Sequence, residues 1–298
     1  AIIVSSIFTT RSLLRAASAM STFVKPEITH HSTYTTISPK NPSALLIIMH
    51  GLGDTAAGFT DVAQMWSNTM PHIKFILPTA PSQPVSMNMN MAMPSWYDIK
   101  GLDERTNEEC DGIFASQTRI NKILDEENLL GIPFSRMAVG GFSQGGAMSL
   151  FVGLQMPVEK KLAGVCVMSG YLAGSKQFKL TPGLENTPVF HGHGTQDPMV
   201  AFSMAEKTKK MLEEAGVTNY EMKSYPIQHT VIPEEIQDVG RFLAKILPGG
   251  TENELEKKAP SEMSVKELKA AIKAGGLGNQ AVGLCEKSEF VKLLNDNL

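Results

Sequence analysis

Ser143 has the surroundings expected of a catalytic nucleophile. It is the central residue of GFSQG (141–145), a Gly-x-Ser-x-Gly pattern that joins an apolar run to a second apolar, helix-like segment. The glycine two residues away on either side permits a sharp strand-to-helix turn that exposes the serine hydroxyl. The start of the following helix also supplies free backbone N–H groups for a developing oxyanion. The pattern predicts acyl transfer through a covalent serine intermediate.

A base and an acid for this chemistry follow Ser143 along the chain. Of the seven histidines, only His191, His193 and His229 come after it. The first two lie in an apolar run that predicts a strand, whereas His229 lies in a loop before the last helix of the domain. We therefore predict His229 as the base. Asp197 lies between serine and base on the turn after the predicted strand, where it would fix the imidazole tautomer. This order of Ser, Asp and His is that of the α/β-hydrolase fold.

The loop HGLGD (50–54) predicts the other half of an oxyanion-binding site. In this fold the amide of the residue after the nucleophile pairs with an amide from the loop after an earlier strand. These two amides would belong to Gln144 and Leu52. We expect His50 to be a structural group of this loop and Asp54 to fix the loop by hydrogen bonding.

The elements that must position these residues alternate between residues 29 and 247. Strands are predicted at 44–50, 72–81, 136–142, 161–171 and 187–194, a strand-like segment at 219–226, and helices at 58–70, 112–130, 144–156, 201–216 and 234–247. Continuous apolar strands separated by helices are typical of a mostly parallel sheet covered on both faces. We therefore predict an α/β fold of the α/β-hydrolase type, with residues 29–247 as the catalytic domain.

The run VSMNMNMAMPSWYDIKG (85–101) alternates methionines with polar or small residues. Such alternation predicts an extended segment with one flexible apolar face. Two interpretations remain open from the sequence. The segment is either an edge strand packed on the core or one wall of a groove for an acyl chain. In the second case Met89, Met91, Met93 and Trp96 would bind substrate, because thioethers adapt to a featureless alkyl chain.

Four motifs together resemble the acyl-protein thioesterases, also called lysophospholipases, of the phospholipase/carboxylesterase family. They are LLIIMHGLGDTAAGF, LPTAPSQPVSMNMNMAMPSWYDIKGLD, RMAVGGFSQGGAMSL and HGHGTQDPMV. The resemblance runs through roughly residues 43–247. It implies a triad of Ser143, Asp197 and His229, oxyanion amides at Leu52 and Gln144, and a hydrophobic acyl groove near the methionine run.

Family members remove palmitoyl groups from protein cysteines, and many also cleave lysophospholipids or small esters. The resemblance therefore implies S-acylated proteins or lysophospholipids as substrates, with transient contact to a membrane surface, and no metal or cofactor. One departure is PIQHTVIPEE around His229, where the family more often has Gly or Met before the histidine and Ser after it. This departure concerns the shape of the loop. A general carboxylesterase and a non-catalytic hydrolase-like scaffold are the alternatives.

The ends of the chain differ in composition from the predicted catalytic domain. Residues 1–28 form an N-terminal extension, whose first 20 residues are either a transit peptide or lie upstream of a start at Met20. Residues 248–263 are predicted as a linker and 264–298 as a small helical module that resembles SAP-like and ARMET-type modules. Its lysines (Lys266, Lys269, Lys273, Lys287 and Lys292) are nearly balanced by acidic residues. We expect this module to bind an unknown protein partner and not nucleic acid.

Composition narrows the class of protein further. The 298 residues include 42% hydrophobic and 19% charged residues, and the net charge is −3. A nucleic-acid-binding protein usually has a concentrated basic surface, which this sequence does not predict. The three cysteines are scattered, and this predicts neither a disulfide framework nor a metal site. We expect a cytoplasmic location, or an organellar one if the first 20 residues are a transit peptide.

Overall fold

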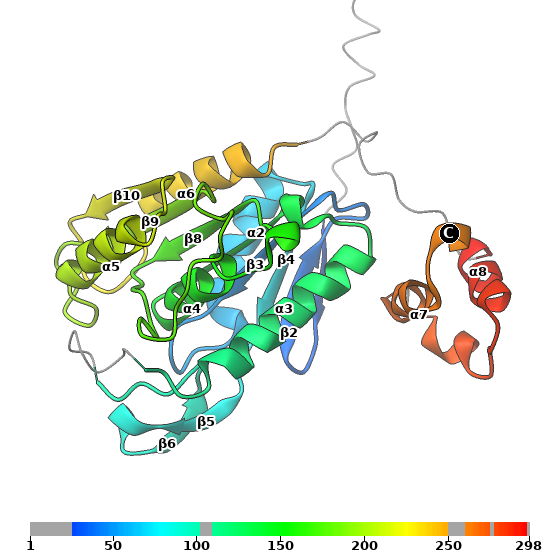
Figure 1. Ribbon diagram of the computed structural model, residues 1–298, viewed down its shortest axis with the longest axis horizontal. Helices are drawn as coiled ribbons and strands as arrows, with labels where there is room; N and C mark the ends of the chain where they lie inside the picture. Colours follow the sequence, from blue (N-terminus) through cyan, green and yellow to red (C-terminus); the bar gives the residue numbers. More distant parts are fainter. Residues whose placement is uncertain (1–25, 102–108, 250–259, 275–276, 297–298) are drawn as a thin grey trace, which may run out of the picture.

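An eight-stranded sheet forms the centre of the computed structural model, which describes residues 26–101, 109–249, 260–274 and 277–296. Its strands lie in the order β1-β2-β4-β3-β7-β8-β9-β10 (Figure 1). Their bounds are β1 Glu27–His30, β2 Tyr34–Ser38, β3 Ala44–Met49, β4 Ile73–Pro78, β7 Met137–Phe142, β8 Gly164–Met168, β9 Val189–Gly194 and β10 Tyr220–Tyr225. The neighbouring pairs from β4 to β10 are parallel, whereas β1–β2 and β2–β4 are antiparallel. The prediction of a mostly parallel sheet is confirmed.

The two strands at the antiparallel edge lie outside the predicted set. Strand β1 is EITH, with both end residues exposed, and in β2 only Thr35 and Ile37 are buried. A single buried aliphatic residue in such a segment gives little apolar signal. Because Glu27 pairs with Ser38, the sheet begins at Glu27 and not at residue 29, where we predicted the domain to start.

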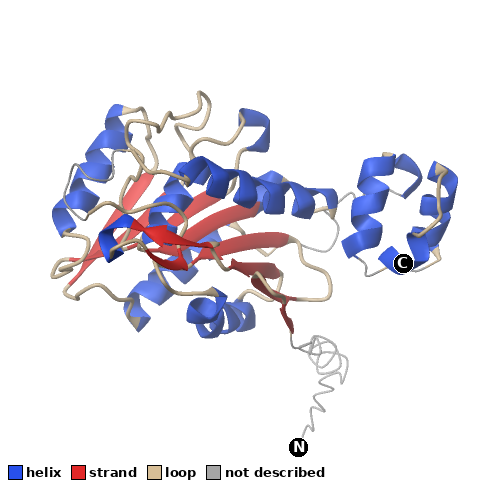
Figure 2. Ribbon diagram, turned by 90° about the horizontal axis from the view of Figure 1, so that it is seen from below, coloured by secondary structure: helices blue, strands red, loops and turns tan. Residues whose placement is uncertain are grey.

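Helices cover both faces of the sheet, as Figures 1 and 2 show. The bounds of the long helices are α2 Thr60–Thr69, α3 Ile113–Leu129, α4 Gln144–Gly153, α5 Phe202–Glu214 and α6 Pro233–Ile246. Helices α2 and α6 pack on one face, where Trp66 and Phe242 meet Phe75 and Phe190. Helices α3, α4 and α5 pack on the other face. Short 3-10 helices occur at η1 Ala56–Phe59, η2 Ser86–Asn88, η3 Phe134–Arg136 and η4 Val158–Lys160.

The methionine run forms a two-stranded antiparallel hairpin apart from the main sheet. Its strands are β5 Ser82–Val85 and β6 Met91–Pro94, and Figure 1 shows the hairpin extending from the body of the domain. The 3-10 turn η2 and the left-handed residues Met89 and Asn90 connect the strands. The run is therefore not an edge strand of the main sheet, but it does pack on the core, where Val85 is buried and Met87 and Met93 are partly buried.

The C-terminal segment forms a pair of helices with a small core of its own. Helices α7 Val265–Ala274 and α8 Lys287–Asn295, joined through η6 Gly278–Ala281, bury Leu268, Ile272, Phe290 and Leu294 against one another. Ser264, directly before α7, accepts a hydrogen bond from the amide of Glu267 at 3.3 Å. The 3-10 turn η5 Pro260–Glu262 lies in the predicted linker, whose residues 250–259 are outside the described ones, as are residues 1–25. No helix in the described parts of the chain is both long and apolar enough to cross a membrane.

Glu235, in the first turn of α6, is fully buried beneath strand β9. Its carboxyl packs on Gly192, where an added Cβ would lie 2.3 Å from Oε1, so a larger residue there would force the Glu235 side chain to shift. Neither carboxyl oxygen has a hydrogen-bond partner within the described residues. Burial raises the pKa of this carboxyl to about 8, so it is largely protonated at neutral pH.

We expect Glu235→Gln to make the protein less sensitive to alkaline pH. The unfolded chain loses the Glu235 proton near pH 4.5 and the folded chain near pH 8, so folding becomes less favourable as pH rises between these values. The glutamine side chain does not ionise. The free energy of unfolding of the variant should therefore exceed that of the wild type by a few kcal/mol at pH 8–9 and equal it at pH 4.5. Urea unfolding across this range measures the difference. The exposed neighbour Glu234→Gln is the control, and an equal gain there would contradict the assignment to burial.

Candidate active site

Ser143 occupies the turn between β7 and α4 with a strained backbone. Its φ is 54° and its ψ is −120°, a region that residues with a Cβ rarely adopt. Its amide donates to the carbonyl of Met168 at 2.9 Å, which fixes the turn to the end of β8. Helix α4, which follows, is buried along its whole length. The hydroxyl is therefore held by rigid elements on two sides while the residue stays half-exposed.

The glycines of the Gly-x-Ser-x-Gly pattern allow this turn by close backbone contacts. A Cβ on Gly145 would lie 2.1 Å from the carbonyl oxygen of Met49, and one on Gly141 would lie 2.5 Å from the same atom. Helix α4 thus begins in direct contact with the end of β3, which precedes the loop 50–54. The predicted reason for glycine at these positions is confirmed by the geometry.

We expect Gly145→Ala to disrupt this turn. The new methyl group meets backbone atoms, which cannot move aside as a flexible side chain can, so the variant should lose about 3 kcal/mol or more of stability. Thermal unfolding measures the loss. The matched control is Gly278→Ala, because a Cβ there meets nothing within 4 Å. A Gly145→Ala protein as stable as this control would show that the turn is looser than described.

The three residues predicted as nucleophile, base and acid lie in one chain of hydrogen bonds. His229 Nε2 lies 2.9 Å from Ser143 Oγ, and His229 Nδ1 lies 2.6 Å from Asp197 Oδ2. The other carboxylate oxygen of Asp197 accepts the amides of Met199 at 2.9 Å and Val200 at 2.8 Å. Because an ionised carboxylate only accepts, His229 carries its proton on Nδ1, and Nε2 is free to accept from the serine.

The hydrogen-bonded residues differ in their exposure to water. The Asp197 side chain is fully buried, and the His229 side chain is 18% exposed. The ring of Phe142 lies 4.7 Å from that of His229, between centroids, and supports one face of the imidazole. The acid is therefore shielded from water, and the base is reachable at the surface.

The loop after β3 lies beside the nucleophile. A Cβ on Gly51 would be 3.5 Å from the Cβ of Ser143, so the amide of Leu52 belongs to the same small region. No hydrogen bond between the residues that the structure describes uses the amides of Leu52 or Gln144. Both donors are available for an oxyanion. Their role there stays a prediction.

The side chain of Gln144 has a structural role that the sequence did not indicate. Its Oε1 accepts the amide of Trp96 at 2.9 Å, while Nε2 donates to Ser95 Oγ at 2.9 Å and to the carbonyl of Tyr97 at 2.8 Å. The segment after the methionine hairpin is thereby tied to the residue that follows the nucleophile. Glutamine suits this position because one planar amide can both donate and accept.

The sequence profile of the phospholipase/carboxylesterase family matches residues 7–247. The chain belongs to this family. Acyl-protein thioesterase 1 of Mycosarcoma maydis is 40% identical over 232 residues, which are 71% of this chain and 96% of that protein. Acyl-protein thioesterase 1 of Neurospora crassa is 40% identical over 218 residues, 69% of this chain and 88% of that protein. The resemblance stated from the motifs is confirmed.

Solved structures agree with the phospholipase/carboxylesterase assignment. Acyl-protein thioesterase 2 of Zea mays has a TM-score of 0.61 at 26% identity, covering 73% of this chain and 100% of that chain. SOBER1 of Arabidopsis thaliana has a TM-score of 0.61 at 28% identity, covering 68% and 99%. The α/β-hydrolase fold is thus confirmed, and the chain is a serine hydrolase.

The four residues predicted to bind substrate differ in how deeply they are buried. Trp96 is fully buried, and its indole N–H donates to the carbonyl of His50 at 2.9 Å, so the prediction that it lines a groove is wrong. A tryptophan ring with a buried acceptor for its N–H is a core residue. Met93 packs partly buried against Gly53 of the oxyanion loop. Met89 and Met91 are 84% and 55% exposed on the hairpin.

His50 is a structural group, as the sequence predicted. It is buried, its Nδ1 donates to the carbonyl of Gly51 at 2.6 Å, and its Nε2 accepts the amide of Ala80 at 2.9 Å. Burial lowers the pKa of His50, which keeps the ring neutral in this arrangement. Asp54 also behaves as expected, because its Oδ1 accepts the amide of Thr55 at 2.7 Å.

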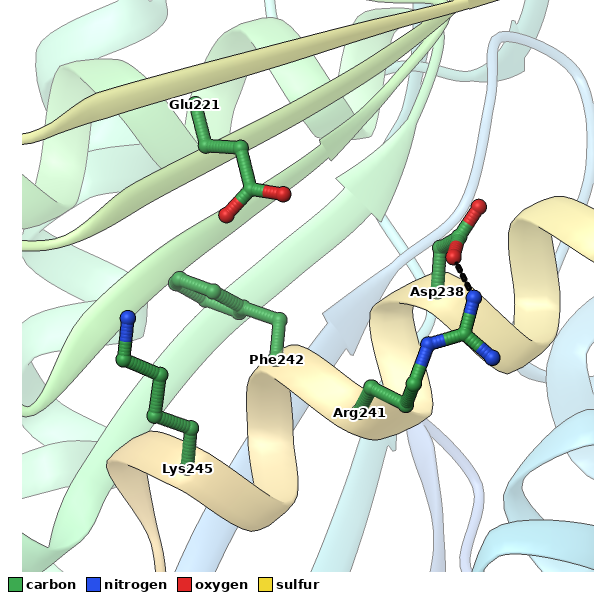
Figure 3. Close-up of a pocket in the computed structure, with 5 residues that line it drawn as sticks. All are labelled: Glu221, Asp238, Arg241, Phe242 and Lys245. Atoms are coloured by element: carbon green, nitrogen blue, oxygen red, sulfur yellow. Dashed lines mark hydrogen bonds and ion pairs between the residues drawn. The ribbon is translucent and has the colours of Figure 1, made fainter.

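A polar pocket on α6 lies away from the catalytic chain. Figure 3 shows its lining, in which Arg241 pairs with Asp238 and Glu221 of β10 faces the helix. Glu221 pairs with Phe190 near the amino end of β9, whereas Ser143 follows the carboxyl end of β7. In open parallel sheets, ligands bind at the carboxyl ends of the strands.

Within the described residues, no group of His, Cys, Asp and Glu side chains could hold a metal ion.

Proposed function

We propose that this protein is an acyl-protein thioesterase, which removes fatty-acyl groups from cysteines of S-acylated proteins. The observation that carries the proposal is the hydrogen-bonded chain from Ser143 through His229 to Asp197, in a chain 40% identical to relatives named acyl-protein thioesterase 1. Ser143 is the nucleophile, His229 the general base and acid, and Asp197 the residue that orients the imidazole.

The reaction proceeds in two steps. Ser143 Oγ attacks the thioester carbonyl carbon while its proton moves to His229 Nε2, and the amides of Leu52 and Gln144 stabilise the oxyanion. The C–S bond then breaks, and the cysteine sulfur takes the proton from His229. A water molecule attacks the acyl-serine, giving its proton to the same nitrogen. Cleavage of the ester bond releases the fatty acid and returns the proton to Ser143.

The methionine hairpin is the proposed location of the acyl chain. Met93 lies next to the loop that carries the Leu52 amide, so an alkyl chain leaving the reacting carbonyl can run along it. Met89 and Met91 are exposed further along the hairpin. Flexible thioethers there suit contact with an acyl chain or transient contact with a membrane surface. These exposed side chains support a lipid-modified substrate.

A lysophospholipase is the second candidate, because the family name includes phospholipases and the same triad cleaves oxygen esters. The test compares kcat/KM for a palmitoyl-cysteine peptide, lysophosphatidylcholine and a short-chain ester with the full chain. We expect the thioester peptide to be the best substrate. A preference for lysophosphatidylcholine would assign lysophospholipase activity instead, and a preference for the short ester would assign a general carboxylesterase.

A cytoplasmic location and a protein partner for the C-terminal helices complete the proposal. Cys166 is a buried free thiol and Cys285 an exposed one. Free thiols are typical of a reducing compartment. The pair α7–α8 has a core of its own, so it can present a surface without help from the hydrolase domain. Its partner is proposed to be a protein.

A further inference from the structure

Two buried histidines behind Asp197 take no part in the proposed mechanism. His191 and His193 are two residues apart in β9, so their side chains lie on the same face of the strand. Both are fully buried. Tyr220, the first residue of the neighbouring strand β10 (Figure 1), lies with its Oη 2.5 Å from His191 Nδ1. Buried polar side chains in such a row need a reason, because each must find a partner away from water.

The Val200 carbonyl fixes the direction of the hydrogen bonds from His193 to Tyr220, and His191 has a further hydrogen bond to the backbone of Gly170. His193 Nε2 lies 2.8 Å from the carbonyl oxygen of Val200, which can only accept, so Nε2 carries the proton. In a neutral ring His193 Nδ1 is then an acceptor, and it lies 3.3 Å from His191 Nε2, which must donate. His191 Nδ1 is in turn an acceptor and receives the hydroxyl proton of Tyr220.

Burial keeps His191, His193 and Tyr220 neutral, as the directions of these hydrogen bonds require. The pKa of His191 is lowered to about 3, first by burial and then by the neighbouring His193. The pKa of His193 is also lowered, chiefly by burial. Burial raises the pKa of Tyr220, so its phenol stays protonated and donates.

The row ends at the acid of the proposed triad. Val200, whose carbonyl accepts from His193, gives its own amide to Asp197 Oδ1 at 2.8 Å. His193 Nε2 also lies 3.6 Å from Asp197 Oδ2, the oxygen that holds His229. The imidazole of His193 and the carboxylate of Asp197 are therefore fixed through the same residue. A shift of one displaces the other.

We infer that His191 is a positioning residue for the reaction: by donating to His193 Nδ1 it holds the imidazole ring of His193, which in turn holds the 197–200 turn and the carboxylate of Asp197 in place. This inference rests on the proposed catalytic role of Asp197. Without a donor at Nδ1, that buried nitrogen has no partner, and the His193 ring can turn away from the Val200 carbonyl and Asp197 Oδ2.

The test compares His191→Leu with His191→Gln in the full chain. Leucine removes the donor and keeps an apolar side chain of similar size, whereas the glutamine amide can donate to His193 and still accept from Tyr220. We expect the leucine variant to lose about tenfold in kcat with KM changed less than about twofold, and the glutamine variant to keep most of the kcat. Imidazole ¹⁵N NMR should show the His193 Nδ1 signal displaced in the leucine variant and close to its wild-type position in the glutamine variant.

Tyr220→Phe provides a milder variant if leucine prevents folding, because it removes only one hydroxyl. It leaves His191 Nδ1 without its donor, so the NMR signals of His191 and His193 should change together, with a smaller loss in kcat. Unchanged His193 signals in both the leucine and phenylalanine variants would overturn the inference, as would a glutamine variant as slow as the leucine one. The NMR measurement needs no substrate, so failure here is distinct from failure of the proposed activity, which the wild-type assay reports.

Discussion

Ser143→Ala abolishes hydrolysis of every acyl substrate, with a loss in kcat of about 10⁶-fold. The alanine variant cannot form the acyl-enzyme, because it lacks the oxygen that lies 2.9 Å from His229 Nε2. Labelling by a fluorophosphonate probe, which reacts with an activated serine, should disappear as well. Steady-state assays with the best substrate and gel detection of the probe measure both effects.

The matched control is Ser203→Ala, since Ser203 is an exposed serine on α5. It should keep full activity and full labelling. Circular dichroism should show the same fold for both variants. Residual labelling of Ser143→Ala would overturn the assignment of the nucleophile. A wild-type protein that neither turns over substrate nor reacts with the probe would instead favour the non-catalytic scaffold.

Asp197→Asn lowers kcat by about 10³–10⁴-fold with little effect on folding. The reason is that the two carboxylate oxygens of Asp197 have different hydrogen-bond partners. Oδ1 accepts the amides of Met199 and Val200, so the asparagine must keep its carbonyl oxygen there. Its NH₂ group then faces His229 Nδ1, which becomes an acceptor. The proton of a neutral His229 moves to Nε2, and that nitrogen can no longer take the proton of Ser143.

Raising the pH separates this explanation from a general loss of structure. A tautomer defect is not corrected by a change in pH, so the variant should stay slow across the alkaline range in kcat measurements. Asp125→Asn, which removes an ion pair with Lys160 on the surface, is the control and should retain full activity. An Asp197→Asn enzyme within tenfold of the wild type would exclude Asp197 as the residue that orients the base.

The sequence predicts the hydrolase fold and the proposed triad of Ser143, Asp197 and His229 because strong local signals mark them. The buried parallel strands are continuous apolar runs, and GFSQG can hardly occur between such a strand and a helix for another reason. The order of Asp197 and His229 then follows from the fold. Edge strands β1 and β2 escape prediction because water covers much of their surface and their apolar residues are few.

Long-range contacts of polar and aromatic side chains were beyond the sequence. Trp96 resembles a groove residue beside a methionine run, and only the fold shows that the carbonyl of His50 takes its N–H. The side chain of Gln144 gives no sign that it ties down residues 95–97. The repeat His-Gly-His in β9 was the one signal for the row behind Asp197, since alternate residues of a strand share a face.

The backbone of Ser143 implies that activity and thermal stability are in conflict at this residue. A side chain at φ 54° and ψ −120° costs about 1–3 kcal/mol, which the rest of the fold must offset. Ser143→Gly should relieve this strain, whereas Ser143→Ala retains it, so the glycine variant should melt at a higher temperature than the alanine variant. Replacement of Ser143 by glycine would therefore favour heat resistance at the cost of the proposed nucleophile.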